Sequence, residues 1–170
     1  MLKKIFRPTP QAERYEEDFY HHPGTIPGTL NIDKDAPPTK ISLIDYTQNT
    51  VIPKKIGIPE DCAAYLNTES VSWVDVRGLG DTKILQQVGK VFQLHPLVLE
   101  DLVNVPERPK IEDYEDQLVI ISRMVMPTPQ ANGFHSEQVS FVLGKNYLLT
   151  VQEEPTLDCF DPVRLRSRTN

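Results

Sequence analysis

The sequence predicts an α/β fold, in which a mixed β-sheet of about six or seven strands is covered by helices on both faces (an αβα sandwich, single domain). Two observations favour this fold. Strand-like runs are interspersed with short helical runs, and several neighbouring strand-like runs are spaced as hairpins, which excludes a purely parallel sheet. The run from Val71 to Val76 places apolar side chains on both of its faces, as a central strand covered on both sides does.

The first third of the sequence predicts a hairpin and a short helix. Residues 40–47 have the pattern of a strand, and residues 50–54 are placed to pair back with them. Residues 59–67 begin with a proline and two acids, which suit the first turn of a helix. Residues 29–32 are expected to form a short edge strand.

The central part of the sequence predicts two helices after the strand at residues 71–76. Asp81 follows a Gly-Leu-Gly turn and is placed to cap the first helix with its carboxylate. His95-Pro96 ends this helix and starts the second, because proline suits a first turn. Pro106 stops the second helix. One apolar stripe marks the buried face of the first helix, made of Ile84, Leu85, Val88, Val91 and Phe92.

The C-terminal part predicts three more strands and a helix. Residues 117–126 are mostly apolar and rich in β-branched side chains, which favours a buried strand. Residues 135–143 and 146–152 flank a Gly-Lys turn and are expected to form a hairpin. A helix is expected to begin at Asp161-Pro162, a capping residue followed by a first-turn proline.

Composition and charge limit the classes of protein to which this chain can belong. Its 170 residues suit one domain, which could bury about 70% of its unfolded surface. The net charge of −6 and the lack of a basic stripe argue against a nucleic-acid partner. Cys62 and Cys159 are too few for a disulfide framework or a structural zinc site, so free thiols are expected.

The sequence also carries no membrane or secretion signal. No apolar run approaches the roughly 18 residues that are needed to span a bilayer. The N-terminus has basic residues without an apolar core behind them, so no secretory signal is predicted. We therefore expect the chain to be soluble and cytoplasmic. The adjacent His21 and His22 do not share a helix face, and they predict no metal site.

No motif in the sequence supports an enzyme. The chain has no G-x-x-x-x-G-K-[ST], no G-x-S-x-G and no H-E-x-x-H. Gly78-Leu79-Gly80 follows a strand as in a dinucleotide-binding turn, but Lys83 occupies the position of the third glycine. His95 is expected to act as a helix cap. Asp75, inside an apolar strand, is expected to be a buried acid that is hydrogen-bonded to a loop backbone.

Glu100 and Asp101 are the unusual feature of the second helix. Both acids lie in its second half, where the helix dipole favours cations. One interpretation is a solvated acidic face or a salt bridge to Arg108 or Lys110. The other interpretation is a divalent-cation site that needs a further ligand from elsewhere.

Several segments resemble the CorA family of magnesium and cobalt transporters. The likeness runs from Trp73 through H-P-L-V-L-E-D at residues 95–101 to R-P-K at residues 108–110. It continues through S-E-Q-V-S at residues 136–140 and ends with F-D-P-V-R at residues 160–164. The resemblance implies that this chain corresponds to the N-terminal cytoplasmic α/β domain of a membrane protein.

The family pattern implies three parts in this chain. They are an N-terminal tail at residues 1–23, the cytoplasmic α/β domain at residues 24–160, and the start of a truncated stalk helix at residues 161–170. Such a domain would lie on the cytoplasmic side of the inner membrane. It would reach the membrane only through C-terminal segments that this chain lacks.

The resemblance also implies a regulatory function. In the family, the subunits form a homopentamer, and Mg²⁺ bound between neighbouring cytoplasmic domains holds the pore closed. Asp101, and more loosely Glu100, match family positions in that intersubunit site, whose other carboxylate comes from the stalk of a neighbour. We therefore expect a domain that senses divalent cations in a magnesium and cobalt channel. Without its neighbour, it should bind Mg²⁺ weakly or not at all.

Two alternatives stay open from the sequence. The chain could be the cytoplasmic domain of a ZntB-like zinc transporter, because the residues that select the ion lie in the pore. It could also be a free-standing α/β domain that binds a small ligand or a protein.

Overall fold

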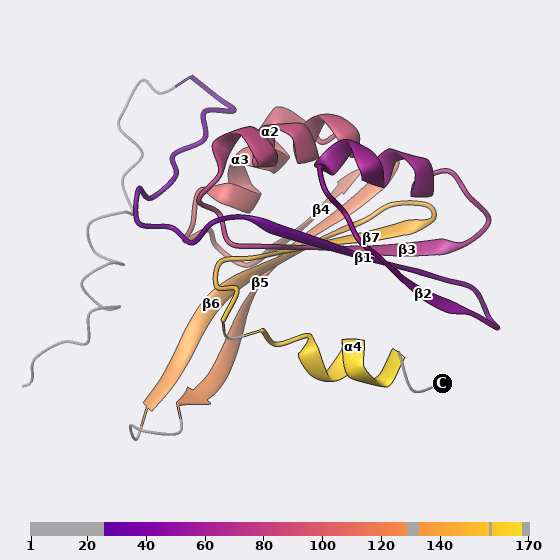
Figure 1. Cartoon of the computed structure of the whole chain (residues 1–170). Coiled ribbons are helices and arrows are strands. Elements are labelled where there is room, and N and C mark those ends of the chain that lie inside the picture. The colour runs from indigo at the N-terminus through magenta and orange to yellow at the C-terminus, as the bar shows by residue number, and fades with distance from the viewer. Residues whose placement is uncertain (1–25, 129–132, 157, 168–170) are drawn as a thin grey trace, which may run out of the picture.

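Within the residues that the computed structural model describes (26–128, 133–156 and 158–167), seven strands form one mixed sheet. In chain order the strands are β1 Lys40–Tyr46, β2 Val51–Lys54, β3 Val71–Arg77, β4 Lys110–Tyr114, β5 Gln117–Thr128, β6 Gly133–Leu143 and β7 Tyr147–Gln152. Their order across the sheet is β2-β1-β3-β7-β6-β5-β4 (Figure 1). Strands β3 and β7 run parallel, and the other neighbouring pairs are antiparallel. The predicted mixed sheet is therefore confirmed.

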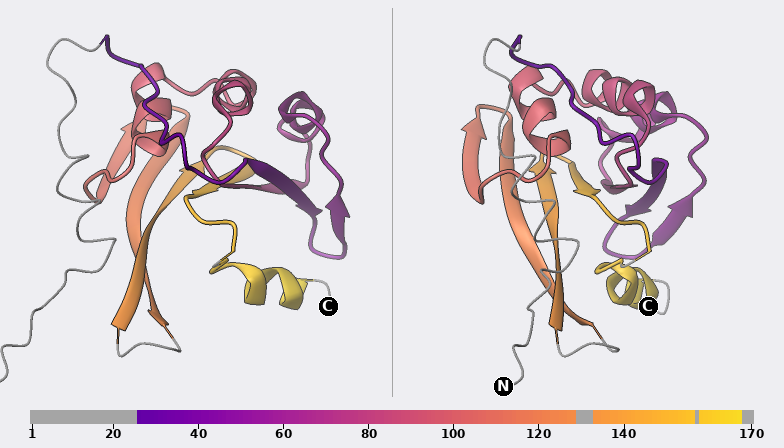
Figure 2. Two further views of the ribbon diagram at one scale, coloured as in Figure 1. Left: turned by 60° about the vertical axis from the view of Figure 1, so that its left-hand side comes forward. Right: turned by 90° about the vertical axis from the view of Figure 1, so that its left-hand side faces the viewer.

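Helices cover both faces of this sheet, as Figure 2 shows. The 3₁₀ helix η1 Pro59–Tyr65 and the α-helices α2 Thr82–Val91 and α3 Pro96–Val103 lie on one face, and α4 Asp161–Ser167 lies on the other. The main core lies between the sheet and the first three helices, and its buried members include Leu43, Val74, Val76, Leu85, Val88, Val98, Leu102 and Leu149. The predicted αβα arrangement is confirmed.

Strand β3 carries large side chains on both of its faces, because helices cover both faces of the sheet (Figure 2). Val74 and Val76 are fully buried in the main core. Trp73 points to the opposite face, where its ring meets that of Phe160, just before α4, at a centroid distance of 5.6 Å. Because successive side chains of a strand alternate between faces, one short run supplies contacts to both layers of helices.

The helix starts follow the predicted caps. Asp81 accepts hydrogen bonds from the backbone N–H groups of Lys83 and Ile84, at 3.0 and 3.1 Å, ahead of α2. His95 caps α3, since its Nδ1 atom accepts from the backbone N–H of Leu97 at 3.3 Å. An aspartate cap such as Asp81 contributes about 1 kcal/mol to helix stability.

The Gly-Leu-Gly turn after β3 has a packing role. Gly80 donates its backbone N–H to the carbonyl of Pro37 at 2.8 Å, and a Cβ atom at Gly80 would overlap the carbonyl oxygen of Ala36. Gly78 has a φ of +83°, a conformation that glycine adopts without strain. The glycines thus admit the segment that leads into β1, and no phosphate site is needed to explain them.

The N-terminal prediction of an edge strand at residues 29–32 is wrong. This segment is irregular, and the side chain of Asn104, just after α3, takes up part of its backbone hydrogen bonding. The predicted tail at residues 1–23 and the two histidines within it lie outside the described residues, as do residues 168–170 of the predicted stalk helix. Within the described ranges, no helix is long and apolar enough to cross a membrane. Cys62 and Cys159 are free thiols, as expected.

Candidate cation site on helix α3

Asp101 lies in the last turn of α3 and is paired with a lysine. Its Oδ2 atom is 2.7 Å from Nζ of Lys110, the first residue of β4. The two side chains are 19% and 28% exposed, so the pair lies at the surface with partial access to solvent. Of the interpretations drawn from the sequence, the salt bridge is confirmed, with Lys110 as the partner.

The surroundings of Lys110 keep its ammonium group charged. Burial opposes the charge, but the hydrogen bond to Asp101 and the negative charges of Asp101, Glu107 and Glu112 outweigh burial and raise the pKa of Lys110. Nζ of Lys110 is also 3.7 Å from Oε2 of Glu112. An ammonium group therefore stands where a cation bound to Asp101 would be attracted.

Glu100 binds a different partner, the segment before β1. Its Oε2 atom accepts a hydrogen bond of 2.5 Å from the backbone N–H of Gly28. Gly28 has a φ of +86°, and a Cβ atom there would lie 3.0 Å from Cβ of Pro96, so this close approach favours glycine. The structure thus engages Glu100 and Asp101 with separate partners.

Asn104 extends the attachment of this segment to α3. Its buried side chain accepts from the N–H of Asn31 at 2.8 Å and donates to the carbonyl of Thr29 at 3.0 Å. The sequence analysis missed this residue. Its place just after the last helical residue was a usable signal, because asparagine is common where a helix ends.

Gln138 fixes the end of α3 on the sheet. Its side chain on β6 is almost fully buried, donates to the carbonyl of Asp101 at 3.0 Å and accepts from the N–H of Glu107 at 2.7 Å. The amide of one glutamine therefore holds both the last turn of α3 and the chain that leads to β4. The position of the Asp101 backbone depends on this contact.

The donor set fits part of a cation site. Mg²⁺ takes six oxygen ligands at about 2.1 Å and commonly keeps several waters. Asp101 offers a carboxylate at the surface, which is the kind of ligand that Mg²⁺ prefers. Across residues 26–128, 133–156 and 158–167, however, no group of three or more His, Cys, Asp or Glu side chains could hold a metal ion. A cation at Asp101 would need ligands from water or from another chain.

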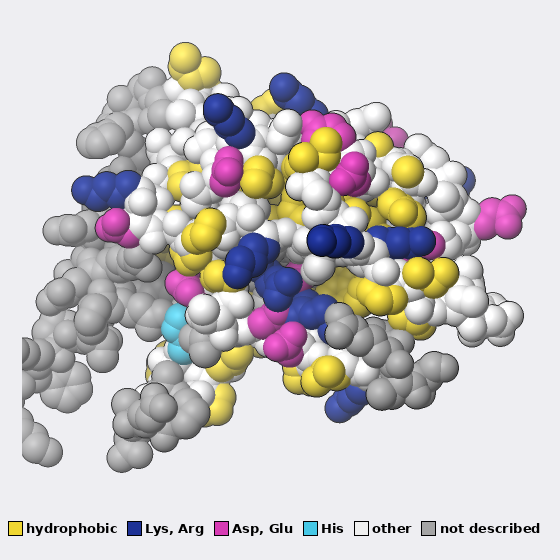
Figure 3. All heavy atoms as spheres, in the orientation of Figure 1, with side chains coloured by type: hydrophobic (Ala, Val, Ile, Leu, Met, Phe, Trp, Pro, Cys, Tyr) yellow, Lys and Arg dark blue, Asp and Glu magenta, His cyan; other side chains and the backbone are white. Residues whose placement is uncertain are grey.

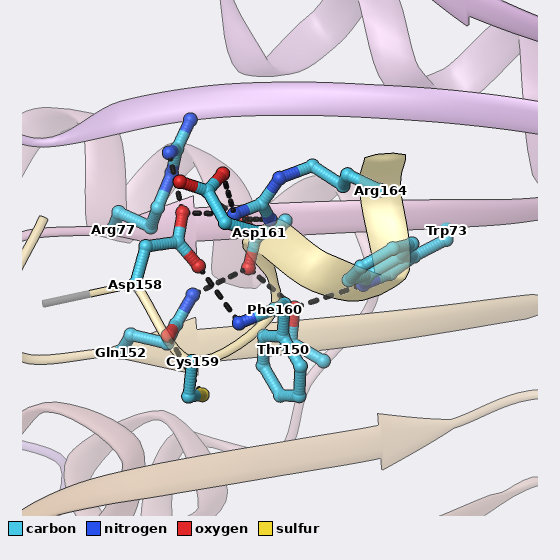
Figure 4. Close-up of polar contacts among 10 residues, drawn as sticks. Trp73, Arg77, Thr150, Gln152, Asp158, Cys159, Phe160, Asp161 and Arg164 are labelled. Carbon is cyan, nitrogen blue, oxygen red and sulfur yellow. Dashed lines mark hydrogen bonds and ion pairs between the residues drawn. The ribbon is translucent and has the colours of Figure 1, made fainter. Parts of the chain in front are cut away.

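On the opposite face of the sheet, ion pairs anchor α4. Arg164 donates to buried Asp75 of β3 at 2.7 Å, to Asp161 at 3.1 Å and also to Asp158 (Figure 4). Arg77 of β3 reaches the same Asp158 at 2.7 Å. Burial opposes ionisation of Asp158, but the hydrogen bonds from Arg164 and from the Phe160 N–H lower its pKa.

The prediction that Asp75 is hydrogen-bonded to a loop backbone is wrong, because its partners are side chains. Besides Arg164, its carboxylate accepts from Thr150 Oγ1 at 2.6 Å and from Gln152 Nε2 at 3.0 Å, both on β7. The guanidinium of Arg164 also lies 5.6 Å from the centre of the Trp73 ring. On the face drawn in Figure 3, basic and acidic side chains gather together beside α4.

Comparisons with known proteins point to the family that the sequence resembles. Residues 68–170 match the family model described as "CorA-like Mg2+ transporter protein". The cobalt/magnesium transport protein CorA of Thermotoga maritima is 36% identical over 148 residues. That alignment covers 87% of this chain and 41% of the relative, so the chain spans less than half the length of the curated relative it matches.

Solved structures show the same fold at lower identity. The soluble domain of CorA from Methanocaldococcus jannaschii has a TM-score of 0.50 and 16% identity, over 76% of this chain and 46% of that one. The ZntB cytoplasmic domain from Vibrio parahaemolyticus has a TM-score of 0.52 and 10% identity, over 75% of this chain and 47% of that one.

The matched family model and the curated relative define a class of ion transporters and not of enzymes. Within that class, the chain belongs to the CorA-like Mg²⁺ transporter family.

Proposed function

We propose that this chain is the cation-sensing cytoplasmic part of a CorA-type magnesium and cobalt transporter, and that Asp101 contributes one ligand to a divalent cation held between subunits. The observation that supports this proposal is the position of Asp101. Its carboxylate lies partly exposed at the end of α3, and its partner, Lys110, is also a partly exposed side chain.

The ion pair with Lys110 makes the site responsive and not permanently occupied. A salt bridge between partly exposed side chains contributes only about 0–1 kcal/mol, so a second cation can compete for the carboxylate. Binding then depends on ligands that a neighbouring subunit, in a homopentamer, would add to Asp101 and Glu100. Without them the carboxylate returns to Lys110.

Competition of this kind links the cation concentration to the assembly of subunits. When Mg²⁺ is abundant, it bridges Asp101 and the neighbour and keeps the subunits together with the pore closed. When Mg²⁺ is scarce, the like charges at the interface repel each other and the assembly loosens. The ion thus shifts a two-state equilibrium because it binds the closed state better.

The likeness of the fold to a ZntB domain supports the ZntB-like alternative. The match to the CorA-like family model gives no support to a free-standing α/β binding domain. At 10% identity, the likeness to ZntB concerns the fold alone. Transport assays with Mg²⁺, Co²⁺ and Zn²⁺ on the protein in its native reading frame separate the first two functions.

A cellular assay tests the proposed role of Asp101. In cells that lack magnesium uptake, the gene in its native reading frame should restore growth at low Mg²⁺. The Asp101→Asn variant should still restore growth but fail to shut off at high Mg²⁺, so that these cells become more sensitive to Co²⁺. The exposed acid Asp113 provides a matched control as Asp113→Asn. Normal shut-off in Asp101→Asn would contradict the proposal.

A further inference from the structure

Glu137 is a buried acid that the cation site does not use. Its side chain on β6 is 0% exposed. Oε2 accepts a hydrogen bond of 3.1 Å from the backbone N–H of Glu154, and Oε1 is buried without a hydrogen-bond partner among the described residues. A buried carboxylate oxygen without a partner is costly when it is charged and much less costly when it carries a proton.

Glu137 faces the layer of the sheet that α4 covers. Side chains alternate along β6, and the neighbouring Gln138 points to α3. Phe141, four residues after Glu137 and on its side of the strand, contacts Phe160 at a ring distance of 5.9 Å. Glu137 therefore lies under the connector that leads from β7 to α4, of which residues 153–156 and 158–160 are described.

The charged groups around Glu137 are mostly acids, and the nearby cations already have partners. Arg123 of β5 lies 3.5 Å from Glu153, and Arg77 and Arg164 bind Asp158. The titratable and charged groups on the elements around Glu137 are His135 on β6, Arg123 on β5, Asp75 and Arg77 on β3, Glu153, Glu154, Asp158 and Cys159 on the connector, and Asp161, Arg164 and Arg166 on α4.

This environment favours the neutral acid. Burial raises the pKa of Glu137 to about 7, the backbone N–H of Glu154 opposes the rise, and the charges of Glu153, Glu154 and Asp158 add to it. The proton is therefore gained or lost near neutral pH, where an ordinary glutamate is fully ionised.

We propose that the protonated Glu137 carboxyl is a latch that holds the connector against the sheet, and that loss of this proton loosens the connector and α4. The ionised Glu137 carboxylate places a further negative charge beside Glu153, Glu154 and Asp158. It also leaves the charged Oε1 atom without a hydrogen-bond partner among the described residues, so access of water to Oε1 stabilises the ionised form. The connector carries Asp158, which binds both Arg77 and Arg164, so loosening it weakens the anchor of α4. This inference concerns a proton and does not depend on the proposed cation function.

Trp73 provides the measurement, because it is the single tryptophan of the chain and its ring contacts both Phe160 and Arg164. We expect its fluorescence in the full 170-residue chain to change between pH 5.5 and 8.5, with a midpoint near the pKa of about 7 and a shift to longer wavelength on the basic side. The Glu137→Gln variant keeps the shape and the neutral charge of the latch, so the transition should be lost. Lack of any transition in the unsubstituted chain would overturn the proposal without recourse to a variant.

Two control variants assign the transition. Exposed Glu60 lies in η1, on the other face of the sheet, and Glu60→Gln should leave the transition unchanged. His135 lies two residues before Glu137 on the same side of β6, so His135→Asn is the decisive control for a contribution from this neighbouring side chain. Retention of the transition in His135→Asn supports the latch. Its loss there, or its persistence in Glu137→Gln, would overturn it.

Discussion

Asp101 and Lys110 form the pair on which the proposed cation response depends. The lysine charge neutralises the carboxylate when no other cation is present, and it also competes with any cation that arrives. A fixed positive charge beside a cation site lowers the affinity of the site, and its removal should raise that affinity.

The Lys110→Met variant tests this competition. We expect it to bind Mg²⁺ several-fold more tightly than the unsubstituted chain, because about 0–1 kcal/mol of ion pairing no longer has to be broken. The rise of the unfolding midpoint with Mg²⁺ concentration measures the difference. Exposed Lys55 serves as the control in the variant Lys55→Met, which has the same change in net charge. An equal effect in both variants would show that net charge, and not this pair, controls binding.

Glu137 should make stability depend on pH. Its pKa is raised from the ordinary 4.5 to about 7, so the folded chain holds a proton that the unfolded chain releases. The stabilisation is complete below pH 4.5, is lost as pH rises through 7, and amounts to about 3 kcal/mol by linkage. Glu137→Gln removes this dependence.

Urea unfolding of the two chains between pH 4.5 and 8 measures this effect. The difference in free energy of unfolding should be near zero at pH 4.5 and should favour the variant by up to about 3 kcal/mol at pH 8. A difference that stays constant with pH would contradict the assigned pKa.

At the scale of the elements, Arg164 joins α4 to the sheet. Its guanidinium pairs with buried Asp75 and with Asp158, so one side chain neutralises two acids. Helix α4 is short, and both this arginine and Phe160, just before the helix, contact β3. The ion pair with Asp75 therefore ties the position of α4 to β3, an interior strand of the sheet.

The Arg164→Met variant should lose up to about 3–5 kcal/mol of stability, because it removes the shorter of the two arginine contacts of buried Asp75 and leaves Arg77 at 3.3 Å. In the double variant Asp75→Asn/Arg164→Met the loss should be smaller than the sum of the single losses, because the buried charge is absent. Chemical unfolding measures both. Exposed Arg108 provides the control, and Arg108→Met should change stability little. Additive losses would refute the buried ion pair.

At the scale of the whole molecule, local patterns predicted the elements better than their arrangement. The caps Asp81 and His95 and the strand from Val71 were predictable because each depends on neighbours in the sequence. The parallel pairing of β3 with β7 was not, since it joins residues more than 70 positions apart. The short segment at residues 29–32 was wrongly predicted as a strand because its hydrogen-bond partner, Asn104, is equally remote.

The candidate site shows the same division. Asp101 and its partner Lys110 lie nine residues apart and were both named from the sequence. The contacts of Gln138 with α3 and of Arg164 with Asp75 span 37 and 89 positions, and periodicity carries no information on them. A buried acid in an apolar strand did indicate that a partner was needed, but not which residue it was.

The most direct test of the account is a Mg²⁺ titration of the 170-residue chain, followed by backbone amide chemical shifts. We expect chemical-shift changes that centre on Asp101 and Lys110, saturate only at millimolar Mg²⁺ and disappear in Asp101→Asn. Binding should be this weak because the remaining ligands belong to a neighbouring subunit. Saturation at micromolar Mg²⁺, or shifts that persist unchanged in Asp101→Asn, would contradict it.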